Sequence, residues 1–109
     1  LPRRSPPGYS TIYGLRDPNT GWFGYIGNTR WPASRYSYHL RGGTMAMVRW
    51  LQALDMTDKQ PEFLILAEVA QADGRAIEEQ WILTMIEQGH PLINLIPKQY
   101  TSRNPFILR

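Results

Sequence analysis

The sequence contains no cysteine, so the chain can form no disulfide bond and offers neither a thiolate metal ligand nor a cysteine nucleophile. Its apolar runs are far shorter than the ~20 residues that span a membrane. Its first residues also lack the basic and apolar segments of a signal peptide. We therefore expect a reducing compartment, no membrane partner, and oxygen atoms as the ligands of any bound metal.

Acidic residues are scarce in the first half of the chain and concentrated in the middle. Residues 1–50 contain seven arginines and one acid, Asp17, whereas residues 51–80 contain seven acids and two basic side chains. The formal net charge of +3 therefore conceals a basic half and an acidic segment. Ten of the twelve basic residues are arginine, whose planar group suits phosphate. The basic half fits either a polyanionic partner or an ordinary solvated surface.

The length of 109 residues fits one domain. Residues 1–8 hold three prolines and a glycine, and we expect them to form an extended or disordered N-terminal arm. The folded domain is expected over residues 9–97, and a peripheral C-terminal tail over residues 98–109. Because the first residue is Leu1 and not methionine, we also expect a piece of a larger or processed protein.

The hydrophobic pattern predicts three strands and three helices. Short apolar and aromatic runs predict strands at residues 9–15, 22–28 and 63–70. Helical spacing predicts helices at residues 33–40, 44–54 and 74–88, before a short closing element at residues 92–96. The order β-β-α-α-β-α indicates an α+β fold with a small antiparallel or mixed three-stranded sheet flanked by helices. We expect residues 63–70 to be its buried central strand.

Turn and cap residues define the ends of these elements. Residues 17–21 form a dense turn signal between the first two strands, which predicts a β-hairpin. A symmetric register would place Tyr13 opposite Tyr25, with both phenols on one face of the sheet. Thr29 and Asp73 are the expected N-caps of the first and last helices.

One carboxylate of the last helix lies where an apolar side chain is expected. Helical geometry places Glu78 within the apolar stripe that contains Ile77, Trp81 and Ile82, with Glu79 at the edge of that stripe. A carboxylate that faces a core is costly unless a cation pairs with it. The pattern therefore predicts either an arginine or a metal ion beside Glu78.

A basic pair also stands out in the first helix. Arg35 and His39 are four residues apart and therefore face the same way. Arginine suits phosphate, and histidine can donate, accept or transfer a proton. Taken alone, the pair also fits a surface contact, and Tyr13 and Tyr25 also fit ordinary strand positions. We interpret His90 as a loop histidine without function.

The spacing of these residues is typical of a known family. The hairpin carries Thr11-Ile12-Tyr13 and Tyr25-Ile26-Gly27, with eleven residues between the two tyrosines. Arg35, His39 and the helical Glu78 follow in order, and Pro91-Leu92-Ile93-Asn94 comes after the last helix. Together these positions resemble the GIY-YIG nuclease family, except that threonine replaces the usual leading glycine. The resemblance covers residues 10–96, and the arm and the tail lie outside it.

The resemblance implies an endonuclease that hydrolyses phosphodiester bonds in DNA with one Mg²⁺ or Mn²⁺ ion. Glu78 would hold that ion, and Arg35 would stabilise the negative charge of the phosphate in the transition state. Tyr13 would be the general base for water, with Tyr25 as the second candidate. His39 would accept the proton of Tyr13 or orient its hydroxyl.

Supporting roles follow from the same resemblance. Asn94 and Gly27 would brace the site or contact the phosphate backbone, and Arg30 and Arg41 would add DNA contacts. We expect an intracellular protein, cytoplasmic or nucleoid-associated. A recognition domain in a larger parent protein would supply sequence specificity, or the arm and the tail would supply a weaker grip on DNA.

Two other classes stay open on sequence alone. A catalytically inactive, nuclease-derived module would bind nucleic acid through its arginines and through Trp22, Trp31 and Tyr36 as stacking residues. A structural domain with a coincidental match would leave the motif residues far apart. The three classes therefore differ in whether Tyr13, Arg35 and Glu78 converge.

Overall fold

The computed structural model describes residues 1–94, and its elements follow the predicted order. Three strands, β1 (Tyr9–Arg16), β2 (Phe23–Thr29) and β3 (Glu62–Ala70), form one antiparallel sheet in the order β2-β1-β3. The helices are α1 (Pro32–Leu40), α2 (Met45–Asp55) and α3 (Gly74–Glu87), and a 3₁₀ turn (Gln71–Asp73) precedes α3. The predicted α+β class is therefore confirmed. The predicted tail lies outside the described residues.

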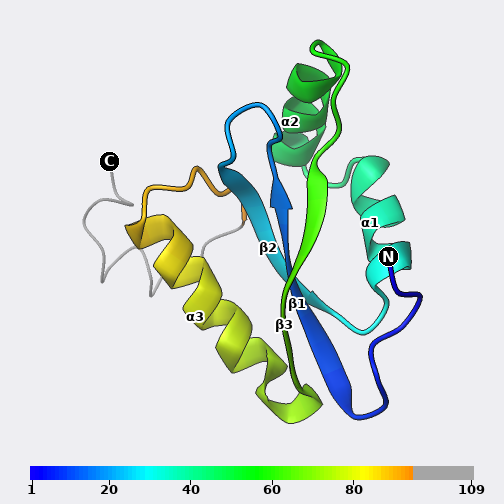
Figure 1. The fold of residues 1–109 in the computed structure, drawn as a ribbon. Helices are drawn as coiled ribbons and strands as arrows, with labels where there is room; N and C mark the ends of the chain where they lie inside the picture. Colours follow the sequence, from blue (N-terminus) through cyan, green and yellow to red (C-terminus); the bar gives the residue numbers. More distant parts are fainter. Residues whose placement is uncertain (95–109) are drawn as a thin grey trace.

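Helices lie on both sides of the sheet, with α3 on one side and α1 and α2 on the other (Figure 1). Side chains alternate along β1, so Ile12 joins the core beneath α3 while Tyr13 joins the core beneath α1 and α2. Ile82 of α3 packs in the first core, and Met47 of α2 packs in the second. Within residues 1–94, no helix is long and apolar enough to cross a membrane.

β3 is an edge strand, so the prediction that residues 63–70 form the central strand is wrong. β1 occupies the centre, and no residue of β3 is fully buried. The strand is apolar because both helical layers reach it. Leu66 and Val69 pack against the α3 core, and Phe63 packs against the core of α1 and α2. The apolar run therefore reflects two covered faces, which an edge strand between helical layers can also have.

The hairpin register differs from the symmetric one that we predicted. Tyr13 lies opposite Gly27, and Tyr25 lies opposite Leu15. The observed pairing differs from the symmetric one for two reasons. The loop closes one residue later than expected, where the Asp17 amide donates to the Trp22 carbonyl (2.9 Å). A β-bulge between Leu15 and Arg16 then shifts the pairing by one more residue. The slip amounts to two residues. Tyr13 and Tyr25 therefore still share a face, as predicted.

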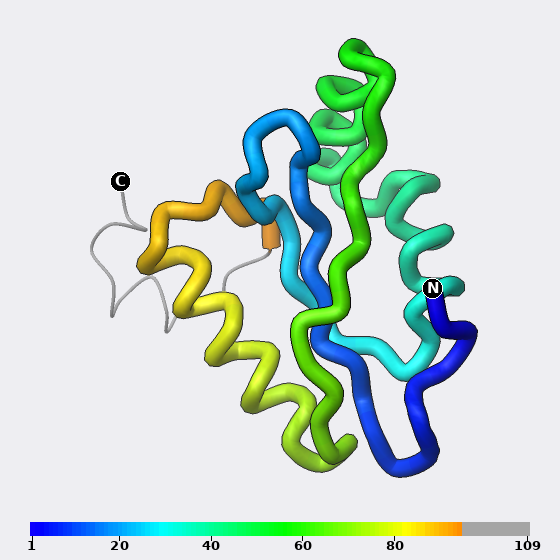
Figure 2. Tube along the Cα trace, viewed as in Figure 1, coloured from blue at the N-terminus to red at the C-terminus, as the bar shows by residue number. Residues whose placement is uncertain are grey.

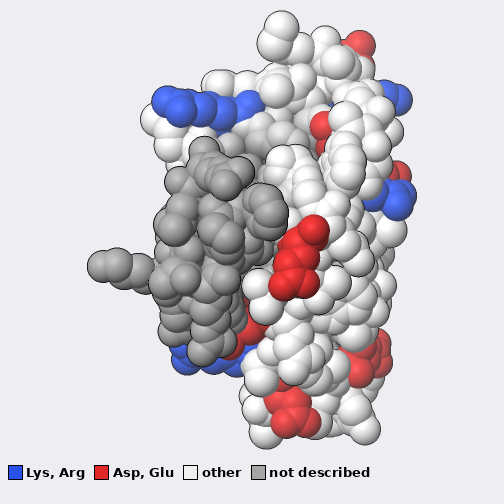
Figure 3. Space-filling view, turned by 90° about the vertical axis from the view of Figure 1, so that its left-hand side faces the viewer, with Lys and Arg blue, Asp and Glu red and all other residues white. Residues whose placement is uncertain are grey.

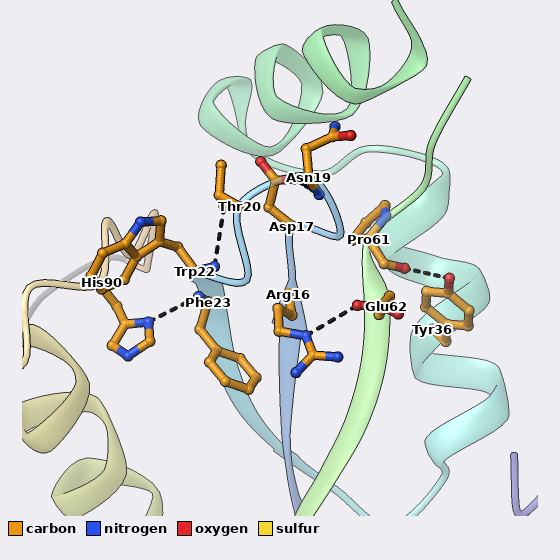
Figure 4. A network of polar contacts seen from close by, with 10 residues as sticks. All are labelled: Arg16, Asp17, Asn19, Thr20, Trp22, Phe23, Tyr36, Pro61, Glu62 and His90. Carbon is orange, nitrogen blue, oxygen red and sulfur yellow. Dashed lines mark hydrogen bonds and ion pairs between the residues drawn. The ribbon is translucent and has the colours of Figure 1, made fainter. Parts of the chain in front are cut away.

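The end of the hairpin is tied to the rest of the domain (Figure 4). The Phe23 amide donates to Nδ1 of His90 (3.0 Å), and the Trp22 ring meets the His90 ring edge-on at 4.8 Å. On the other side, Arg16 of β1 forms an ion pair with Glu62 of β3 (3.0 Å). The loop histidine thus joins the chain after α3 to the start of β2.

The segment after α3 continues this attachment along the outer edge of β2. The Ile93 amide donates to the Gly24 carbonyl (2.7 Å). The Asn94 side chain accepts from the Ile26 amide (3.0 Å) and donates to the Ile26 carbonyl (2.7 Å). Residues 91–94 therefore bond to β2 without forming a regular strand. The last two residues of the predicted closing element lie outside the described residues.

Of the two predicted helix caps, Asp73 is the N-cap residue of α3 as predicted, whereas Thr29 is not the N-cap of α1. The N-cap of α1 is Trp31, because Pro32 occupies the first helical position, and the Thr29 hydroxyl instead accepts from the Trp31 amide (3.0 Å). Asp73 makes no side-chain cap bond, because the 3₁₀ turn runs directly into α3. By contrast, Thr44 caps α2 by accepting from the Met47 amide (3.2 Å).

The N-terminal arm is held against the start of α1 (Figure 2). The Ser5 amide donates to the Arg30 carbonyl (2.8 Å), and the Ala33 amide donates to the Pro2 carbonyl (3.1 Å). The Ser5 side chain is buried, and its hydroxyl bonds to that of Thr11 (2.6 Å). The arm contains bends and a turn but no helix or strand, and these bonds hold it against β1 and α1.

We predict that Asn94→Ala lowers the free energy of unfolding by about 1–3 kcal/mol, because two backbone groups of Ile26 lose their partners. Asn19→Ala is the matched control, since the Asn19 side-chain amide reaches only the exposed Thr57 hydroxyl (2.9 Å). Its loss is expected to stay within about 0.5 kcal/mol. Urea denaturation measures both variants, and equal losses would show that Asn94 does not brace β2.

Candidate active site

The five residues assigned to catalysis come from four elements and lie in one region of the molecule. Tyr13 and Tyr25 come from β1 and β2, Arg35 and His39 from α1, and Glu78 from α3. The ring centroid of His39 lies 5.8 Å from that of Tyr13 and 4.7 Å from that of Tyr25. The Arg35 charge lowers the pKa of each phenol, and the Glu78 charge raises it. The wide separation that a coincidental match would give is not observed.

Tyr13 is the buried centre of this group. Its side chain is 1% exposed and stacks on Phe63, with ring centroids 4.5 Å apart. Its hydroxyl bonds to Nε2 of His39 (2.7 Å). Burial, with a smaller contribution from Tyr25, raises the pKa of Tyr13 well above its ordinary value. The phenol is therefore protonated at neutral pH and shares a hydrogen bond with His39.

Gly27 leaves room for this phenol. It lies opposite Tyr13 in the hairpin, and a Cβ atom at position 27 would lie only 2.3 Å from the Tyr13 hydroxyl oxygen. Even alanine would therefore push the phenol out of place. The close approach gives Gly27 a packing role, which is one of the two roles that the sequence predicted for it.

His39 is 4% exposed, although it lies on a surface helix. Burial and, secondarily, the Arg35 charge lower the pKa of His39 to about 4, so the ring is neutral at neutral pH. The neutral ring carries one proton, and which atom donates in the bond between Nε2 and the Tyr13 hydroxyl depends on which ring nitrogen holds that proton. Of the two predicted roles, this geometry favours orienting the Tyr13 hydroxyl over accepting its proton.

Tyr25 is the more accessible of the two phenols. Its side chain is only partly buried, whereas Tyr13 has almost no exposed surface. Burial is the largest cause of its raised pKa, followed by the Glu78 charge, while Arg35 and the Tyr13 hydroxyl lower the pKa. Tyr25 is therefore the phenol of the pair that a substrate can reach.

Glu78 is half-buried beside this cluster. Burial and the neighbouring Glu79 charge raise its pKa, and Arg75 and Arg35 lower it. Arg75 forms an ion pair with Glu79 (3.7 Å), and no arginine pairs with Glu78 among residues 1–94. The predicted arginine partner is therefore not found in that part of the chain. What remains is a partly desolvated carboxylate with no counter-charge at contact distance among residues 1–94.

This carboxylate can be tested as a metal ligand. Within residues 1–94, no three histidine or acidic side chains are grouped as a preformed metal site. Glu78 nevertheless fits a sparse site, because a hard cation such as Mg²⁺ favours oxygen ligands and keeps several water molecules. Its unpaired charge supplies one such ligand. Substrate oxygens and water would supply the others.

Arg35 reaches solvent from the first turns of α1. Its side chain is exposed, and its guanidinium lies 5.5 Å from the ring of Tyr38, one turn further along the helix. Tyr38 was not among the residues singled out from the sequence, although its spacing from Arg35 places both on one face. Arg35 also lines two surface hollows, one of which contains Arg30 and Arg75.

Other predicted contact residues have different surroundings. Asn94 bonds to the backbone of β2, so its side chain braces the sheet. Arg41 is exposed beyond the other end of α1 and lines neither hollow. The Tyr36 hydroxyl donates to the Pro61 carbonyl, which removes this residue from the stacking candidates (Figure 4). Trp22 is at the end of the hairpin, beside His90.

Both acidic and basic side chains lie on the α3 side of the molecule (Figure 3). In the view onto the α3 side, acidic side chains lie over the visible face and basic side chains lie at its margins (Figure 3). The arginine-lined hollows lie at the junction of β2 and α1, where Thr29 and Trp31 line both of them. The basic half of the sequence therefore provides the surface next to the candidate site.

We predict that NMR titration of the folded protein gives His39 a pKa of about 4, against an ordinary value of 6.5. The chain has two histidines, so His90→Gln assigns the signals. Because the unfolded chain takes up a proton first as the pH falls, the His39 contribution to stability is lost between pH 6.5 and about 4. The free energy of unfolding should therefore decrease over that range.

His39→Gln should flatten this pH dependence. His90 supplies a second part of it, because burial also lowers the pKa of His90. His90→Gln therefore measures that part separately. A His39 ring that titrates near pH 6.5 in the folded protein would contradict the buried, neutral state described above.

Comparison with known proteins assigns the chain to no family. No family model matches the chain, and neither a curated protein nor a solved structure matches it. The resemblance to GIY-YIG nucleases therefore depends on the motif residues themselves. The arrangement of those residues in the fold is the independent observation from which a function can be argued.

Proposed function

We propose that this protein is a metal-dependent endonuclease of the GIY-YIG type, which hydrolyses phosphodiester bonds in DNA. The observation that carries the proposal is the convergence of Tyr13, Tyr25, Arg35, His39 and Glu78 from four separate elements. A purely structural domain has no need for a half-buried carboxylate near two phenols that forms no ion pair within residues 1–94. Phosphodiester hydrolysis uses each of these groups.

The reaction has a defined balance of bonds and protons. The oxygen of a water molecule bonds to phosphorus, and the bond from phosphorus to the 3′ oxygen breaks. The proton of the water passes to a base, and the 3′ oxygen takes up a proton. The products are a 5′-phosphate and a 3′-hydroxyl. When bound at Glu78, a divalent ion supplies Lewis-acid stabilisation of the phosphate and the leaving oxygen.

The other side chains divide the remaining work. Arg35 is exposed and always charged, so it is suited to bind the phosphate and stabilise its extra negative charge. Tyr25 is the phenol that substrate water can reach. Burial and the Glu78 charge raise its pKa, and the Arg35 charge offsets part of that rise. We therefore assign the role of general base to Tyr25, the second candidate of the sequence analysis.

Tyr13 and His39 act as positioning residues in this proposal. Their hydrogen bond joins β1 to α1, and α1 carries Arg35 one turn before His39. Tyr13 itself has almost no surface through which water could approach. Its hydroxyl therefore contributes by fixing the position of α1 relative to the hairpin, so that Arg35 and Tyr25 face the same substrate atoms.

We predict that the protein nicks supercoiled plasmid DNA in the presence of Mg²⁺ or Mn²⁺ and that EDTA abolishes the activity. Glu78→Gln should reduce the rate by about 100-fold or more because it removes the ligand of the metal ion. Arg35→Ala should do the same because it removes a positive charge that stabilises the transition state. The matched controls are Glu79→Gln and Arg41→Ala. Both are expected to keep most of the activity, since neither residue belongs to the cluster.

The same assay separates the roles of the two phenols. Tyr25→Phe removes the proposed base and should cost more than Tyr13→Phe, which leaves the ring and its stacking on Phe63 in place. The reverse order would return the role of base to Tyr13. DNA binding without cleavage at any metal concentration would instead support the inactive binding module.

A further inference from the structure

Trp31 occupies an unusual position for a large aromatic side chain. It is the N-cap residue of α1, it is 46% exposed, and it packs in neither hydrophobic core. Its main-chain carbonyl accepts the Arg35 amide (2.9 Å), so the indole is fixed one turn from the exposed arginine of the candidate site. Single exposed aromatic side chains are common on protein surfaces, so the surroundings of this indole decide whether it can bind a ligand.

Two open hollows border this indole. The first, of about 550 Å³, is lined by Ser34, Arg35 and Tyr38 together with Trp31. The second, of about 400 Å³, extends from Trp31 across the end of β2 to the start of α3. Both volumes fall in the range of small-ligand sites, about 300–1,000 Å³. The Trp31 side chain therefore lines both hollows, and each hollow can accept part of a linear polymer.

Positive charge surrounds the indole. Arg30, Arg35 and Arg75 line the two hollows, and no acid lines either of them within the described residues. A fourth guanidinium, that of Arg4, lies 5.5 Å from the centre of the Trp31 ring. Arg4 lies there because the next residue of the arm, Ser5, donates its amide to the Arg30 carbonyl. Charge complementarity therefore favours a polyanion as the ligand. A polyanion bound by these arginines would pass over the Trp31 ring.

An exposed aromatic ring among arginines matches the way proteins bind single-stranded nucleic acid, where the bases stack on aromatic rings and basic residues follow the phosphates. In a duplex, each base already stacks on its neighbours, so only an unpaired base presents a free face. We propose that Trp31 stacks on an unpaired nucleobase of the DNA substrate while the arginines of the two hollows bind the adjacent phosphates. The preferred substrate is then DNA that carries single-stranded nucleotides.

This inference deepens the proposed function and rests on it for the identity of the substrate. It differs in what it requires, because stacking needs no metal ion and no bond cleavage. Binding can therefore be measured in EDTA, where the hydrolysis proposed above cannot proceed. Fluorescence anisotropy would compare three labelled oligonucleotides: a single strand, a blunt duplex of the same sequence, and that duplex with a single-stranded flap.

We expect the single strand and the flap to bind more tightly than the blunt duplex. Trp31→Ala should weaken binding of the single strand by about 5- to 150-fold, the loss of one stacked base. Trp31→Phe keeps an aromatic face and should retain most of the affinity. Trp22→Ala is the matched control, because Trp22 is similarly exposed (44%) but lies at the other end of the hairpin. Its affinity should stay at the wild-type value.

The arginines can be tested through salt dependence. For single strands, each phosphate contact adds about 0.7 to the slope of log affinity against log salt. Arg30→Ala and Arg75→Ala should each reduce that slope by about this amount. Arg49→Ala, an exposed residue of α2 outside the hollows, should leave it unchanged. An unchanged slope in the first two variants would contradict the assignment of phosphates to the hollows.

Several results would overturn the stacking proposal. These are equal affinity for the single strand and the blunt duplex, an affinity unchanged by Trp31→Ala, or no DNA binding at all. Circular dichroism of Trp31→Ala checks that the variant is folded, and Trp31→Phe gives a second reading if it is not. Stacking without any cleavage in Mg²⁺ would reject the proposed hydrolysis alone, while cleavage without dependence on Trp31 would reject this inference alone.

Discussion

The hydrogen bond from the Tyr13 hydroxyl to Nε2 of His39 is the contact on which the site depends most. It is 2.7 Å long and links the central strand of the sheet to the helix that carries Arg35. A buried donor or acceptor that loses its partner costs free energy of folding, so each of the two residues restricts the position of the other. The space for the phenol comes from Gly27, which has no Cβ atom to obstruct it.

The chemistry of the cluster follows from differences in burial. Tyr13 and His39 are withdrawn from water, which keeps one a phenol and the other a neutral imidazole. Tyr25 and Glu78 are only partly withdrawn, and Arg35 is exposed. A gradient from buried positioning groups to accessible reactive groups is what a site needs if its substrate arrives from solvent. The same gradient continues outward to Trp31 and the hollows beside it.

Sequence reasoning predicted the order of elements because the apolar periodicities and the turn at residues 17–21 were strong local signals. It also selected Glu78 over Glu79, since helical geometry alone puts Glu78 among apolar residues. It misplaced β3 as the central strand, because an apolar run reports covered faces and not strand order. It likewise missed the register, which depends on a bulge and a loop closure that composition does not reveal.

The least predictable features were contacts between distant segments. Nothing local indicates that Asn94 bonds to both backbone groups of Ile26, or that Ser5 anchors the arm beside Arg30. The exposure of Trp31 agrees with its place among the predicted stacking residues, whereas Tyr36, another of them, bonds to the distant Pro61 carbonyl. Burial and contacts between distant residues exist only in the folded molecule. They are what distinguishes a positioning residue such as Tyr13 from an accessible one such as Tyr25.

The central claim is that Glu78 holds a divalent ion beside the phenols, and paramagnetic broadening by Mn²⁺ tests it most directly. In amide NMR spectra, substoichiometric Mn²⁺ should broaden the signals around Glu78 and Tyr25 first. The broadening should disappear in Glu78→Gln and persist in Glu79→Gln. Broadening that centres elsewhere, or that survives in Glu78→Gln, would contradict the account.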